Sequence, residues 1–145
     1  MSLVEDVIAR LRAIAPAVFA DVGGAADFAS IDTVPMVMPA AYVLVEAEAS
    51  GPNERSTGPV LQRTETDIAV VIVTGNVSDF VGDAASRDIE GLKNKVRKAL
   101  IGFAPTSADD PLQHISGELL KARNGVVWHR EIFGTTVLLL EEEQQ

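Results

Sequence analysis

The sequence predicts an α+β fold, in which an antiparallel or mixed sheet of two β-hairpins carries two main helices on one face. Three observations support it: two segments with apolar residues at helical spacing, a long apolar strand in mid-chain, and an Asn-Gly turn near the end. The expected order is helix, strand, strand, helix, strand, strand. Residues 1–145 are expected to form a single domain.

The chain begins with the pattern of a capped helix. Ser2 and Glu5 have the spacing of a capping box, in which each side chain accepts a hydrogen bond from the backbone of the other. The apolar positions that follow at helical spacing are Leu3, Val7, Ile8, Leu11 and Ile14. Pro16 ends this helix or marks a break. Residues 18–39 contain two adjacent glycines and two prolines, which favour a loop with room for one short helical turn.

A first hairpin is expected between residues 41 and 75. Residues 41–48 and 60–75 have strand composition, and the polar segment between them, at about 49–60, is expected to be a flexible loop because it contains two glycines and two prolines. The second strand is polar on both faces in its first half and apolar on both in its second half. Its length of roughly 50 Å exceeds what a domain of this size needs. We therefore expect a hairpin with a buried base and a polar tip that projects as an arm.

A turn at residues 76–82 should lead to the second main helix. The apolar face of this helix is formed by Ile89, Leu92, Val96, Leu100 and Phe103. Acidic residues lie near its start and a basic cluster lies at 93–98, which is the distribution that the helix dipole favours. This complementarity accounts for the basic cluster better than an anion-binding site does.

A second hairpin is expected from strands at about 112–123 and 126–140. Asn124-Gly125 is the strongest short signal for a two-residue type I′ turn. In that register Trp128 faces Lys121, and neither face of the hairpin is cleanly apolar or polar, so both faces are expected to be partly covered. Trp128 either packs against the chain's own helices or contributes to an interface. Residues 141–145 are a charged tail that is expected to fray.

Composition narrows the possible functions. Twelve basic and 21 acidic residues give a net charge of −9, which disfavours sequence-independent DNA binding. The chain contains no cysteine, so disulfides, thiolate metal ligands and a cysteine nucleophile are excluded. No apolar run approaches the ~20 residues needed to cross a bilayer, and no membrane partner is expected.

The sequence offers little for catalysis. In the type I′ register its two histidines, His114 and His129, lie about six strand positions or roughly 20 Å apart, too far to share a metal ion. Nucleotide-binding glycine loops and the G-x-S-x-G elbow are absent. The carboxylates of the predicted arm are expected to be solvated rather than held in a pocket. We therefore expect no enzyme activity, no cofactor and no metal site.

Several short segments follow one another in a characteristic order along nearly the whole chain. They are the capped first helix, residues 38–43 before the first strand, the 51–53 loop, the strand end at 74–79, the helix at 92–100 running into 101–105, the acidic loop to 111–112, and the hairpin at 124–128. In this order the sequence resembles the tail terminator proteins of long-tailed bacteriophages and related prophages. None of these segments is a catalytic signature.

The resemblance implies a structural role in the phage tail. Such proteins form a six-membered ring on the last ring of the tail tube, stop tube growth and present a surface to head-completion or neck proteins. It also implies a protein that is made in the bacterial host cytoplasm and ends in the virion tail, with DNA only as passing cargo. The acidic composition would suit a channel through which DNA slides without sticking.

Exposure, rather than the resemblance, suggests which residues meet other subunits. The candidate interface residues are Asn53 and Arg55 on the arm loop, Arg63 and Glu65 on the arm, and Trp128 and Arg130 on the second hairpin. A projecting arm and a two-sided hairpin are features that a subunit of a closed head-to-tail ring needs.

Two alternatives remain open. One is a head–tail connector or neck protein of similar size and fold, which would leave tail length unaffected. The other, from a different class, is a small α+β enzyme or ligand-binding domain, which would require a pocket lined by convergent polar groups.

Overall fold

The computed structural model describes residues 2–75 and 83–142; for residues 83–87 it describes the backbone alone. Its elements are α1 (Leu3–Arg12), β1 (Asp21–Gly23), α2 (Ala25–Ala29), β2 (Ala40–Asn53), β3 (Leu61–Gly75), α3 (Asp83–Leu100), β4 (Gln113–Arg123) and β5 (Val126–Leu140). The α+β class is confirmed. The element order differs from the predicted one, because β1 and α2 lie between the first helix and the first hairpin.

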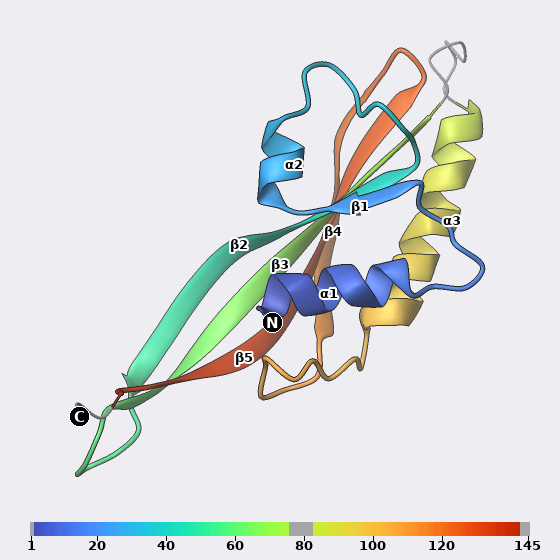
Figure 1. Ribbon diagram of the computed structural model, residues 1–145. Coiled ribbons are helices and arrows are strands. Elements are labelled where there is room, and N and C mark those ends of the chain that lie inside the picture. Colours follow the sequence, from blue (N-terminus) through green and yellow to red (C-terminus); the bar gives the residue numbers. More distant parts are fainter. Residues whose placement is uncertain (1, 76–82, 143–145) are drawn as a thin grey trace.

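Five strands form one mixed sheet in the order β1-β2-β3-β5-β4 (Figure 1). The two expected hairpins, β2–β3 and β4–β5, are present, and β3 also pairs with β5 along its whole length. β1 pairs in parallel with the start of β2. A strand of three residues is too short to show an alternating pattern, which is why the sequence did not predict it.

One face of the sheet is covered by α1 and α3, as predicted (Figure 1). The residues buried in this layer include Val7, Leu11, Ile68, Val70, Ile72, Val96, Leu100 and Phe133. The capping box of α1 is also confirmed: the Ser2 hydroxyl accepts from the Glu5 N–H at 3.1 Å, and the Glu5 carboxylate accepts from the Ser2 N–H at 3.2 Å. Burial of these apolar stripes is the main stabilising contribution to the layer.

The opposite face is covered at one end by α2 and the loop that follows it. The Phe28 ring lies 5.5 Å from the Tyr42 ring and 6.4 Å from the Trp128 ring, measured between centroids. Val34 and Met38 pack against the same small core. Both faces of β5 are therefore covered, as the mixed polarity of its residues predicts, whereas β4 is exposed at ten of its eleven residues.

Beyond the helices, β2, β3 and β5 continue as a narrow arm (Figure 1). β2 runs on to Asn53, so residues 49–53, which were expected in the loop, are strand; Ser50, for example, pairs with Thr64. β5 adds a third strand that the prediction of a two-stranded arm lacked, since residues 138–140 pair with residues 61–63.

Two predictions fall wholly or partly outside the described residues: the turn at 76–82, and residues 143–145 of the charged tail. At the start of that tail, the Glu141 N–H donates to the Val60 carbonyl at 2.7 Å. Among the described helices, none combines the length and the apolar character needed to span a membrane.

Candidate assembly surfaces

The tip of the arm is organised by Asn53. Its side-chain oxygen accepts hydrogen bonds from the N–H of Arg55 at 3.1 Å and from the N–H of Leu61 at 2.9 Å. The Arg55 guanidinium donates to the Pro59 carbonyl at 3.4 Å. Asn53 and Arg55 are exposed and Pro59 and Leu61 are half-buried, so the tip is a loop closed by its own hydrogen bonds that presents Asn53 and Arg55 to solvent.

Arg63 and Glu65 lie on the surface of the arm, as expected. The Arg63 guanidinium is 3.1 Å from a carboxylate oxygen of Asp110, in the loop before β4, and both side chains are about half exposed. An exposed pair of this kind contributes at most about 1 kcal/mol. Glu65 pairs across the sheet with Ala49 and Thr136, and it is exposed.

The same end of the arm carries an apolar segment. Leu138, Leu139 and Leu140 are exposed by 38%, 49% and 53%, and Glu141 and Glu142 follow them. Because successive strand residues point to opposite faces, the apolar surface is present on both sides of the strand. Contiguous exposed apolar surface is a feature of protein contact sites.

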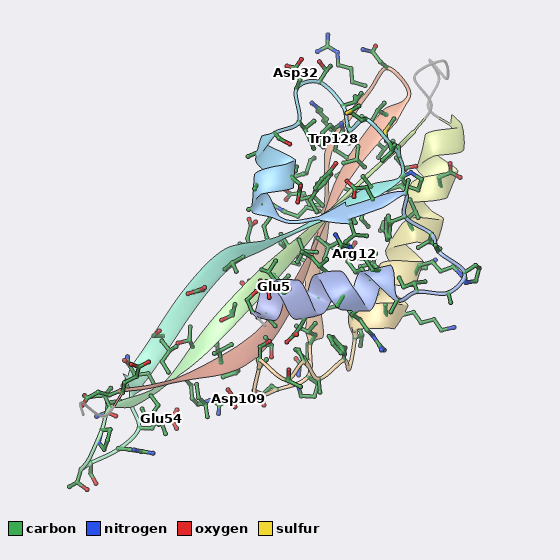
Figure 2. The ribbon with its side chains drawn as sticks, in the orientation of Figure 1. Glu5, Arg12, Asp32, Glu54, Asp109 and Trp128 are labelled. Carbon is green, nitrogen blue, oxygen red and sulfur yellow. The ribbon has the colours of Figure 1, made fainter. Side chains whose placement is uncertain are left out.

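Trp128 lies at the opposite end of the sheet, near the β4–β5 turn. Figure 2 shows it close to the loop that carries Asp32, far from Glu54 at the arm tip. Lys121 is its partner across the hairpin, as predicted, and the Lys121 ammonium lies 4.7 Å from the indole centroid. The indole is 8% exposed. Trp128 thus packs against its own chain and also lines an open pocket of about 450 Å³, together with Thr33, Val34, Lys121, Arg123, Asn124 and Val126.

Arg130 of β5 joins the neighbouring strand β4 to β2, which lies two strands away on the other side of β5. One terminal nitrogen donates to Glu46 of β2 at 2.9 Å, and the other donates to Glu118 of β4 at 2.7 Å. Its side chain is 29% exposed. The guanidinium therefore bridges the sheet within one chain, and any contact with another subunit must compete with these two carboxylates.

A buried carboxylate on the helix-covered face was missed by the sequence analysis. Glu131 of β5 has no exposed surface, and it accepts two hydrogen bonds from Arg97 of α3, at 2.8 and 2.9 Å. The Nε2 atoms of His129, at 2.7 Å, and of His114 also hydrogen-bond to it. Burial opposes ionisation of Glu131, but the hydrogen bonds from Arg97, His129 and His114 outweigh it and hold its pKa below the ordinary value.

The predicted separation of the two histidines is wrong. Two β-bulges each insert an extra residue into β4, one at Ile115 and one at Leu120. His114 therefore pairs with Phe133 rather than Thr135, and His129 pairs with Leu119 rather than Leu120. Both imidazoles reach one carboxylate. Even so, the described residues contain no group of three or more His, Asp or Glu side chains placed to hold a metal ion.

Gly117 makes room for the buried carboxylate. It lies opposite Glu131 in the β4–β5 pair, and a Cβ atom at this position would be 2.6 Å from Glu131 Oε1 and 3.2 Å from an Arg97 nitrogen. A glycine inside a strand is the sequence signal for a close approach at this site, but its position opposite Glu131 depends on the bulge at Leu120, because the unbulged register places it opposite Ile132.

These arrangements have different roles. The cluster around Glu131 joins α3 to β4 and β5 and is structural, whereas the exposed arm and the Trp128 pocket lie at opposite ends of an elongated sheet (Figure 1). Such a molecule is an α+β subunit whose surfaces suit contact with other proteins.

Comparison with known proteins identifies the class. The phage tail terminator protein family matches residues 1–142, and the chain belongs to this family. It is therefore a structural protein of a phage tail and not a member of an enzyme family. A chain from the virion of a native gene transfer agent particle has a similar fold, with a TM-score of 0.59 and 17% identity over 95% of this chain and 96% of that chain. No curated protein matches the sequence.

Proposed function

We propose that this protein caps the phage tail tube as a homohexameric ring, ends tail polymerisation and provides the surface to which the head joins. The observation that carries the proposal, beyond family membership, is the three-stranded arm that extends past the helices. A contact between the arm of one copy and a different surface of the next is heterologous, and such contacts generate a ring when the rotation closes.

The two edges of the sheet support the same assembly. Among the described residues, β4 pairs only with β5, and β2 beyond Tyr42 pairs only with β3. Unpaired backbone groups on a strand edge are ready to bind another chain. The two open edges belong to different strands, β2 and β4, so pairing of one edge with the other would be a heterologous contact of the kind that can close a ring.

The proposed partners are further copies of this chain, the tail tube protein on one side of the ring, and a head-completion or neck protein on the other. DNA would only pass through the ring, and the net charge of −9 suits such a passage. We propose that residues 1–145 act as one domain, made in the bacterial host cytoplasm and incorporated into the virion tail. Its interfaces would include Asn53, Arg55, Arg63, Glu65, Trp128 and Arg130.

Electron microscopy of lysates from the parent phage or prophage, with this gene deleted, tests the proposal. Overlong tails without heads are the expected result, because an uncapped tube continues to grow. Native mass spectrometry of the purified chain, alone and with the tube protein, then tests for six copies in the ring.

Two other outcomes would overturn the proposal in different ways. Tails of normal length beside unjoined heads would assign the protein to the head–tail connector or neck. Normal particles would exclude both phage roles and leave a small α+β enzyme or ligand-binding domain as the alternative.

A further inference from the structure

We propose that the acidic end of β5, residues 138–142 of one copy, docks into the pocket at Trp128 of the next copy. This inference rests on the proposed ring and names a contact that would close it. It follows from the chemistry of two surfaces at opposite ends of the same chain.

The pocket combines apolar and cationic walls. Val34, Val126 and the Trp128 indole supply apolar surface, and Lys121 and Arg123 supply positive charge. Its volume of about 450 Å³ lies within the range of about 300–1,000 Å³ for ligand-binding pockets. An aliphatic side chain followed by a carboxylate has the chemistry that fits these walls.

The end of β5 supplies that chemistry. Its three exposed leucines are followed by the exposed carboxylates of Glu141 and Glu142. A segment with two adjacent carboxylates is complementary to a site where two cations, Lys121 and Arg123, flank an apolar wall. Docking would bury leucine side chains that the isolated chain leaves in water.

A chain cannot place this segment in its own pocket. Val126, which lines the pocket, and Leu140 are the two ends of one strand, β5, and fifteen strand residues span about 50 Å. Figure 1 shows the same separation, with the end of β5 at the arm tip and the β4–β5 turn at the far end. The contact must therefore join two copies.

Stoichiometry favours a second copy over another acidic protein. Each copy carries one such segment and one such pocket, so a closed ring would satisfy all of them and leave none open. An acidic segment of a tube or neck protein in the same pocket is the competing outcome of the test.

Engineered cysteines give a direct test, because the natural chain contains none. We would combine Leu140→Cys with Thr33→Cys, at the end of β5 and at the pocket, and oxidise the purified protein and tails assembled with this variant. Ladders of disulfide-linked copies are expected, up to the full ring. Each single variant can link at most two copies. Leu140→Cys with Lys98→Cys is the matched control that should form no ladder, because Lys98 lines a different cationic pocket, with Arg10 and Lys95.

Charge exchange gives a second, independent test. Lys121→Glu with Arg123→Glu should weaken self-association about tenfold or more, and Glu141→Lys with Glu142→Lys in the same chain should restore it. Lys95→Glu with Lys98→Glu makes the same charge change on α3 and should leave association unaltered. Urea unfolding of each variant establishes that it folds.

The outcomes separate this inference from the proposed function. Rings that form without the 33–140 cross-link and are insensitive to charge exchange would overturn the docking contact and leave the ring intact. A cross-link from residue 33 to a different tail protein would also overturn it. Normal tails in the gene deletion would overturn the proposed function itself.

Discussion

Arg97 of α3 holds the carboxylate of Glu131 in β5 through two hydrogen bonds, at 2.8 and 2.9 Å, across 34 residues of sequence. Glu131 is fully buried, whereas the Arg97 side chain is 34% exposed. A buried ion pair contributes little net stability, but removing one partner strands the other in a medium of low polarity. The position of α3 on the sheet therefore depends on both residues.

Replacing Glu131 with Gln should destabilise the protein by about 1.5–3 kcal/mol, because the amide has nearly the same shape but cannot accept all the hydrogen bonds that the carboxylate accepts from Arg97, His129 and His114. Urea unfolding at neutral pH would measure the difference. Glu118→Gln is the matched control: Glu118 pairs with Arg130 on an exposed side of the sheet, and its loss should cost less than about 1 kcal/mol. Equal effects of the two variants would contradict the structural role of Glu131.

The lowered pKa of Glu131 predicts a dependence of stability on pH. Because the folded-state pKa lies below the unfolded value of about 4.3, the carboxylate stabilises the fold above that value and loses this contribution as pH falls through the folded-state pKa. The advantage of the natural chain over Glu131→Gln should therefore shrink from about pH 5 downward. Urea unfolding of both proteins at several pH values would show a constant difference if Glu131 were not held ionised by Arg97, His114 and His129.

Two glycines should respond in opposite directions to alanine. Gly117→Ala places a methyl group 2.6 Å from the Glu131 carboxylate and should cost about 1–3 kcal/mol. Gly91 lies exposed within α3 with open space around it, so Gly91→Ala should stabilise by about 0.5–1 kcal/mol through better helix propensity. Thermal unfolding of both variants measures the contrast, and a neutral Gly117→Ala would show that Glu131 does not need this space.

The arm tip should loosen locally when Asn53 loses its acceptor oxygen. Asn53→Ala removes the hydrogen bonds to the N–H groups of Arg55 and Leu61, whereas Asn53→Asp keeps an acceptor for both. Limited proteolysis within residues 54–60 should become faster in the alanine variant and stay slow in the aspartate variant. Global unfolding should be almost unchanged in both, because the loop lies outside the core.

The elements with strong local signals were predictable from the sequence. The capping box of α1, the apolar stripe of α3 and the Asn-Gly turn before Val126 all depend on residues close together in the chain. β1 was missed, because its three residues form a strand only by pairing with β2. The extension of β2 to Asn53 was missed for a similar reason: its glycine and proline favour a loop, but pairing with β3 overrides them.

The site was less predictable than the fold. The strand bulges at Ile115 and Leu120 shift the register in ways that alternation does not reveal, so the histidines were placed too far apart. The sequence around Glu131 does not show that it is buried, because its partner Arg97 lies 34 residues away, on α3. The exposure of Asn53, Arg55, Arg63 and Glu65 on the arm did follow from their polarity, and their contacts with other subunits stay a prediction.

The pairing of β3 with β5 has a consequence for how the protein is made. β3 lies at the centre of the sheet, and one of its two edges stays open until residues 126–140 have left the ribosome. Part of the core beneath the helices is also missing until then, because Val127 and Phe133 of β5 belong to it. Nascent chains should therefore leave one edge of an apolar strand open from the emergence of β3 until β5 follows, and a ribosome stalled before β5 should hold a chain that cannot close its own sheet.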